Sequence, residues 1–114
     1  MGQLTTHVLD ISAGLPAHGV RIEVHGAGMV APIEVSTGRD GRLPQPLLAG
    51  AALLQGRYTL TFHLGAYFRA RGVVLPEPAF LEQAVIHLGV ADPAAHYHVP
   101  LLITPWSYSV YRGG

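Results

Sequence analysis

Apolar and polar residues alternate along two stretches of this sequence, and this alternation limits the folds that the chain can adopt. In VRIEVH at 20–25, valine and isoleucine alternate with arginine, glutamate and histidine. In RYTLTFHL at 57–64, every second residue is tyrosine, leucine or phenylalanine. Successive side chains of a strand point to opposite faces of a sheet, so such a stretch buries one face and exposes the other. The pattern therefore predicts half-buried β-strands.

Other parts of the chain have the composition of strands, and turn signals separate them. We expect further strands at roughly 4–10, 33–37, 81–90, 96–104 and 106–112, with a short one within 47–54. Glycine and proline mark turns between them, at 14–16, 26–28, 39–41, 44–46, 75–78 and 91–93. Only GAYFRARG, at 65–72, has a helical pattern. Seven or eight strands with this spacing predict an all-β fold, a two-sheet antiparallel sandwich with one short helix, as a single domain over residues 1–114.

The charge content of the chain limits its partners. Charged residues make up 12% of the sequence, compared with about 25% in average soluble domains. Part of the surface is therefore expected to be buried in an oligomer. Seven arginines balance seven acidic residues, so a basic surface for nucleic acid or an anionic membrane is not expected. The sequence contains no cysteine, which excludes disulfides and thiolate sites.

No targeting segment or membrane anchor is evident. MGQLTTHVLD, at the start, lacks the basic and apolar regions of a signal peptide. No apolar run approaches the roughly 20 residues that a spanning helix needs. We therefore expect a cytoplasmic protein.

Most familiar catalytic motifs are absent or fail in context. GAGMVA at 26–31 matches the dinucleotide-binding pattern GxGxxA, which requires a helix to begin at its last positions. Pro32 and a strand-like IEV follow instead, so a hairpin turn is the better interpretation. No GxSxG, P-loop or HExxH motif is present.

The histidines are the remaining candidates for chemistry. His96 and His98 are two residues apart in an expected strand, which places both rings on one face. With His7 they could form a three-histidine zinc site that has an open fourth position. Alternatively, neutral imidazoles near an arginine could deprotonate a water molecule without a metal. A third interpretation is that these are ordinary structural histidines, and their spacing does not decide among the three.

Arg42 directly follows the Asp40-Gly41 turn, so its side chain leaves from a tight loop. It could be a solvated hairpin arginine. It could also bind a planar carbonyl group or stabilise an oxyanion.

Three segments resemble the signatures of the 5-hydroxyisourate hydrolase family, which is related to transthyretin. They are LTTHVLD at 4–10 with GLPA after it at 14–17, TGRDGRLPQPLL at 37–48 and HYHVPLLITPWSYSVYRGG at 96–114. The closing segment is the most specific. Transthyretin shares the fold but lacks the second histidine of HYH, here His98, and this difference favours an enzyme over a carrier.

The resemblance implies a set of site residues. The family's catalytic residues fall on His7, Arg42 and His98, with no metal and no cofactor, and His96 is more structural. The end of the chain would line the substrate pocket, with binding residues Tyr111, Arg112, Gly113 and Gly114. The family usually ends in serine where this chain has Gly114, and the stretch 75–90 departs from a shorter, more strand-like family segment.

The resemblance also implies a reaction and an assembly. Water would open the six-membered ring of 5-hydroxyisourate at an acyl carbon, in urate degradation, by general-base catalysis. The fold would be transthyretin-like, and the assembly a homotetramer built as a dimer of dimers, with sites in the channel between the dimers. The alternative is a transthyretin-like carrier that binds a flat aromatic ligand in that channel.

Overall fold

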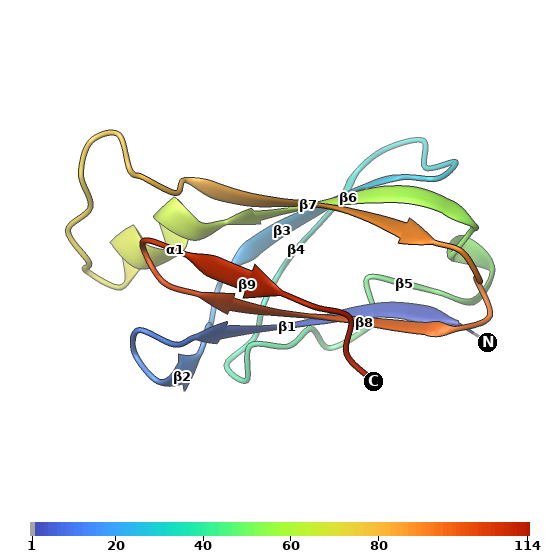
Figure 1. Ribbon diagram of the computed structural model, residues 1–114, viewed down its shortest axis with the longest axis horizontal. Coiled ribbons are helices and arrows are strands. Elements are labelled where there is room, and N and C mark those ends of the chain that lie inside the picture. The colour runs from blue at the N-terminus through green and yellow to red at the C-terminus, as the bar shows by residue number, and fades with distance from the viewer. Residues whose placement is uncertain (1) are drawn as a thin grey trace.

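Two β-sheets pack face to face in the computed structural model of the protein, which describes residues 2–114 (Figure 1). The first sheet has the strand order β2-β1-β8-β9, and β5 also pairs with β1. Its strands are β1 (Gln3–Asp10), β2 (Leu15–Pro16), β5 (Leu48–Ala49), β8 (His96–Ile103) and β9 (Tyr108–Val110). The second sheet has the order β4-β3-β6-β7, and its strands are β3 (Arg21–Gly26), β4 (Ile33–Ser36), β6 (Gly56–His63) and β7 (Gln83–Val90). The helices are the 3₁₀ turn η1 (Gly50–Ala52) and α1 (Leu64–Ala70).

The predicted fold class is confirmed, with local differences. An additional short strand, β2, forms where we expected only a turn, because Leu15 and Pro16 pair with the end of β1. Leu64, which we placed at the end of a strand, instead begins α1. The last strand is shorter than the expected 106–112, because the Thr104 side chain accepts hydrogen bonds from the amides of residues 106 and 107 and holds a turn there.

One strand pair does not follow the antiparallel expectation. β1 and β8 are parallel and remain in register over eight residue pairs, from Gln3 with His96 to Asp10 with Ile103. Parallel neighbours need a long crossover connection, and here the chain forms the whole second sheet before it returns. The two strands therefore lie side by side although they are far apart in the sequence (Figure 1).

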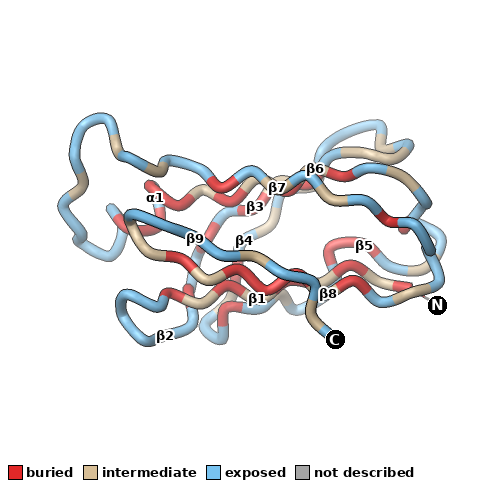
Figure 2. The backbone as a smooth tube through the Cα atoms, in the orientation of Figure 1, coloured by how far each residue is buried: buried red, intermediate tan, exposed pale blue. Residues whose placement is uncertain are grey.

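Alternation along the strands separates a buried face from an outer face. In β1, Leu4, Thr6, Val8 and Asp10 are buried, and the residues between them are partly exposed (Figure 2). Across the core, β6 contributes large buried side chains from the opposite sheet, such as Tyr58 and Phe62. The outer face of β1 is consequently available for a site, because the core fixes the strand from the other side.

A buried carboxylate connects the end of β1 to α1. Asp10 is 1% exposed, and one of its oxygens accepts a hydrogen bond from the Tyr67 hydroxyl at 2.9 Å. Its other oxygen accepts from the backbone amides of Ser12 and Ala13. Burial and the contact with Asp10 raise the pKa of Tyr67 to about 12. Tyr67 therefore stays protonated as the donor.

Within residues 2–114, no helix is both long and apolar enough to cross a membrane.

Replacing Tyr67 with phenylalanine should lower the free energy of unfolding by about 1–3 kcal/mol, because the buried Asp10 would lose a donor and keep its desolvation cost. Urea unfolding followed by circular dichroism measures this loss. Tyr108→Phe is the control, since Tyr108 is 38% exposed and water can replace contacts of its hydroxyl. Equal losses in the two variants would show that the Asp10 contact contributes nothing specific.

Candidate functional site

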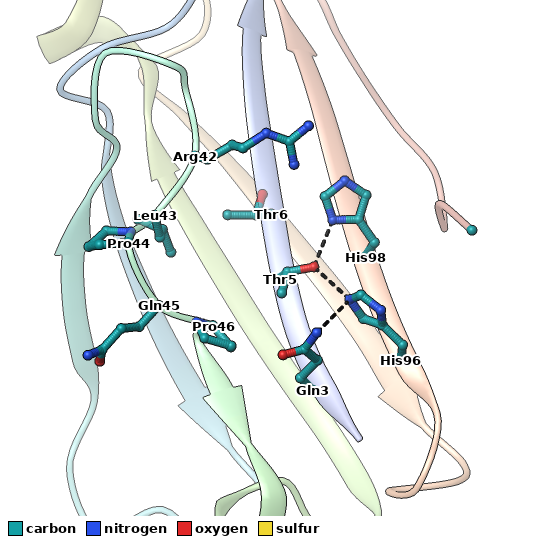
Figure 3. Close-up of a pocket in the computed structure, with 11 residues that line it drawn as sticks. Gln3, Thr5, Thr6, Arg42, Leu43, Pro44, Gln45, Pro46, His96 and His98 are labelled. Carbon is teal, nitrogen blue, oxygen red and sulfur yellow. Dashed lines mark hydrogen bonds between the residues drawn. The ribbon is translucent and has the colours of Figure 1, made fainter. Parts of the chain in front are cut away.

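A cavity of about 450 Å³ lies on the outer face of the first sheet (Figure 3). Its floor is formed by β1 and β8, and its opposite wall is the segment 42–46, RLPQP. Gly114 also lines it. The volume lies within the range of small-molecule sites, about 300–1,000 Å³.

The parallel register explains why histidines gather in this cavity. His96 pairs with Gln3 and His98 pairs with Thr5, so two polar residues of β1 meet two histidines of β8. Residues of one strand that are two apart point to the same face, and these four side chains all line the cavity. His7 follows Thr5 on this face and pairs with Pro100.

His98 is held in place and kept neutral by its surroundings. Its Nδ1 lies 2.7 Å from the hydroxyl oxygen of Thr5. Burial lowers the pKa of His98, and the nearby positive charge of Arg42 lowers it further, followed by smaller effects of His96 and His7. Because the usual histidine pKa is about 6.5, His98 is unprotonated at neutral pH. A neutral imidazole can accept a proton, as a general base must.

Arg42 reaches the cavity from a tight turn. Gly41 has φ +76°, and a Cβ there would collide with the carbonyl oxygen of Val8, so the turn requires glycine. The Asp40 carboxylate accepts a hydrogen bond from the Arg42 amide at 2.9 Å and fixes the residue after the turn. Arg42 forms a β-bridge with His7, and its guanidinium extends over β1 towards His98 (Figure 3).

One ring nitrogen of His7 is already hydrogen-bonded to the backbone. Its Nε2 lies 2.8 Å from the backbone carbonyl oxygen of Asp40. A carbonyl only accepts, so this nitrogen must carry a proton. In the neutral ring, Nδ1 is then the only position that can accept. Among residues 2–114, by contrast, Nε2 of His98 has no hydrogen-bond partner.

The chain end divides between two locations. The Gly113 amide donates to the His98 carbonyl at 2.7 Å, and a Cβ on Gly113 would come within 2.8 Å of the His98 ring. Gly114 has open space where a side chain would start, so a serine would fit there. Tyr111 and Arg112, which we expected at the substrate pocket, border a second hollow of about 350 Å³ beside β7 and β9, and their part in substrate binding stays a prediction.

Within residues 2–114, His7, His96 and His98 are not grouped as the three ligands of a zinc site. The ring centres of His96 and His98 are 6.3 Å apart, and one nitrogen of each ring faces the Thr5 hydroxyl. His7 directs Nε2 to a backbone carbonyl. Across residues 2–114, no group of three histidine, cysteine, aspartate or glutamate side chains is placed to hold a metal ion.

Sequence reasoning did not identify Gln3, Thr5 or the wall at 43–46 as parts of a site. Period two does place Gln3 and Thr5 on the same face as His7, so a signal was present. The alternation could not show which residue of β8 lies beside Gln3 or Thr5.

The sequence matches the HIUase/Transthyretin family over residues 4–113. The chain belongs to this family.

Several proteins and solved structures are similar to this chain over nearly its whole length. The 5-hydroxyisourate hydrolase of Pseudomonas aeruginosa is 53% identical, and the match covers 99% of this chain and 92% of that protein. The structure of the Klebsiella pneumoniae 5-hydroxyisourate hydrolase superposes with a TM-score of 0.83 at 36% identity, with full coverage of both chains. The structure of an (S)-allantoin synthase has a TM-score of 0.93 at 40% identity and covers 99% of this chain, which spans 44% of that longer chain.

The burial of His98 and its nearness to Arg42 predict a lowered pKa for its ring. Its pKa, measured by NMR of the ring, should lie below the ordinary value of about 6.5. Arg42→Gln should raise this pKa, because the variant loses a positive charge that opposes protonation, whereas burial still acts. Arg39→Gln is the matched control, since Arg39 lies in the same turn region but does not contribute to the shift. A His98 pKa that is unchanged in Arg42→Gln would show that Arg42 does not act on this ring.

Proposed function

We propose that this chain is a 5-hydroxyisourate hydrolase, which opens the six-membered ring of its substrate with water in urate degradation. The observation that carries the proposal is the joint placement of Arg42 and a neutral His98 in one cavity, in a chain that is 53% identical to a named 5-hydroxyisourate hydrolase. The cavity offers a base and a fixed positive charge, which together suit hydrolysis at an acyl carbon.

In the proposed reaction, His98 transfers the proton and Arg42 stabilises the negative charge. Nε2 of His98 takes a proton from water, and the resulting hydroxide adds to the acyl carbon of the ring. The oxygen of the tetrahedral intermediate becomes negative and is stabilised by the Arg42 guanidinium. The carbon–nitrogen bond then breaks and the ring nitrogen receives the proton held by His98, while the acyl carbon becomes a carboxylic acid that loses its proton to solvent and is left as a carboxylate. The general base is thereby regenerated without a metal or cofactor.

His7 has an orienting role in this proposal. With Nε2–H donated to the Asp40 carbonyl, its Nδ1 can accept a hydrogen bond from water or substrate. His98 is the base in this proposal, because its Nε2 is unengaged by residues 2–114 and its lowered pKa keeps the ring neutral and able to accept a proton.

The carrier alternative fits the cavity less well. A carrier of a flat aromatic ligand requires a mainly apolar surface. This cavity instead presents two histidines, an arginine, two threonines and two glutamines. Such polar groups cost free energy to desolvate, and they suit a polar reacting substrate.

We also propose that the protein acts as a homotetramer, a dimer of dimers. β9 and β7 are the last strands of their sheets, and both edges lie on the same side of the sandwich (Figure 1). Unpaired edges invite pairing with a second copy. The 12% charge content is consistent with buried surface. Cytoplasmic residence stays a prediction.

Loss of either catalytic histidine should reduce hydrolysis strongly. His98→Ala should lower kcat by about 10²-fold or more, which is the scale of general-base contributions. His7→Ala should also lower kcat by about 10²-fold or more, because a misplaced water or substrate can cost that much. His96→Ala should cost less, because His96 is placed to act through a neighbour. The assay follows freshly generated 5-hydroxyisourate by stopped-flow absorbance, and only acceleration above spontaneous decay counts as activity.

The matched control is His87→Ala, because His87 contacts Thr59 on the other sheet. All variants should keep the wild-type circular dichroism spectrum, and wild-type activity should survive exhaustive chelation. Wild-type protein that binds substrate without accelerating its decay would support the carrier instead. Activity that is lost on chelation and restored by zinc would overturn the metal-free mechanism.

Removing Tyr111–Gly114 should weaken the tetramer and the activity together. The segment lies next to the β9 edge, and Gly113 bonds to the backbone of His98, so assembly and site share these residues. Analytical ultracentrifugation measures the assembly and the stopped-flow assay measures turnover.

Gly114→Ser serves as the control for the terminal residue. Because a side chain there meets open space, we expect an intact tetramer and little change in turnover. A truncated protein that remains a fully active tetramer would contradict the shared role of the chain end.

A further inference from the structure

The Thr5 hydroxyl lies between two histidine rings on the floor of the cavity. Its oxygen is 2.7 Å from Nδ1 of His98 and 3.1 Å from Nε2 of His96 (Figure 3). A hydroxyl has one proton, so it can donate to only one of these nitrogens. The other ring must donate its own proton to Thr5. The direction of this short chain therefore decides which nitrogen of His98 is protonated.

Gln3 favours one direction. Its side-chain amide nitrogen lies 3.5 Å from the same Nε2 of His96 (Figure 3). An amide nitrogen only donates, which makes Nε2 of His96 an acceptor. Thr5 then also donates to this nitrogen. Its oxygen is left to accept a hydrogen bond from Nδ1–H of His98.

The Arg42 charge favours the same arrangement. With Nδ1 protonated, the neutral His98 ring has its lone pair on Nε2, on the ring edge away from Thr5. The guanidinium of Arg42 extends towards this part of the ring in Figure 3. A permanent cation stabilises a nearby lone pair and disfavours a proton there. Arg42 and Gln3, which lie at opposite ends of the chain of contacts, thus select one tautomer.

We propose that Thr5, oriented by His96 and Gln3, is a positioning residue that holds His98 as the Nδ1–H tautomer and leaves Nε2 as the base. The tautomer assignment stands on the geometry of the free protein. Its catalytic consequence rests on the proposed hydrolase function. His96 acts on the reaction only through Thr5, and needs no contact with substrate.

Two substitutions isolate the hydroxyl. Thr5→Val keeps the branched shape of the side chain and removes the oxygen, whereas Thr5→Ser keeps the oxygen. Thr59→Val is the matched control, because it removes a hydrogen bond of 3.2 Å between another threonine and the ring of His87 on the opposite sheet. Any loss caused only by removing a threonine hydroxyl from a strand should also appear in this control.

The first measurement needs no substrate. Nitrogen-15 NMR of the histidine rings, at a pH where His98 is neutral, reports which nitrogen carries the proton. Wild type, Thr5→Ser and Thr59→Val should show His98 protonated at Nδ1, and Thr5→Val should shift the ring towards the Nε2–H form. An Nε2–H ring in the wild type would overturn the proposal, even if Thr5→Val failed to fold.

The second measurement is the kinetic effect on 5-hydroxyisourate. Thr5→Val should lower kcat about 10-fold or more, part of a general-base contribution, with little change in KM. Thr5→Ser should restore most of the rate, and Thr59→Val should leave it unchanged. A changed tautomer with unchanged kcat would overturn the catalytic role of Thr5. A wild type without hydrolase activity would refute the proposed function alone, because the NMR result would still decide the tautomer.

Discussion

The parallel pairing of β1 with β8 is the constraint on which the candidate site depends. It places Thr5 beside His98 and Gln3 beside His96, although these partners are more than 90 residues apart in the sequence. The buried alternate residues of both strands hold this register, because a shift of one residue would move the core side chains to the outer face. The same hydrophobic contacts that stabilise the sandwich therefore set the distances between the polar groups of the cavity.

The charge balance of the cavity follows from the residues that β1, β8 and the segment 42–46 place around it. Its lining contains Arg42 and two histidines but no acidic residue, and Arg42 forms no ion pair with any residue in the range 2–114. An uncompensated guanidinium opposes protonation of the nearby imidazole of His98. In the proposed reaction the same charge would be available to a developing oxyanion, since no carboxylate of residues 2–114 forms an ion pair with it. In the proposed mechanism, Arg42 therefore adds to the effect of burial in keeping His98 neutral, and the same charge would stabilise the oxyanion that forms.

The sequence predicted most of the strands because period two reports which residues are buried, and burial also holds the sheets together. It did not predict the parallel pair, since alternation has no information about a strand's neighbour or direction. For the same reason the histidines could be named from the sequence, but the Thr5 link between His96 and His98 could not. Family resemblance supplied Arg42, which by position alone could equally have been a solvated residue of a turn.

The chain end connects this site to the edge of the sheet. After β9 leaves the sheet edge, the chain turns back so that the Gly113 amide donates to the carbonyl of His98. Any side chain on Gly113 would meet the His98 ring, so glycine allows the tail to lie directly against the proposed base. If a second copy pairs with the β9 edge, it restrains the start of this tail and thereby the backbone of His98. Assembly would then act on catalysis by fixing where the base stands, without adding a catalytic group of its own.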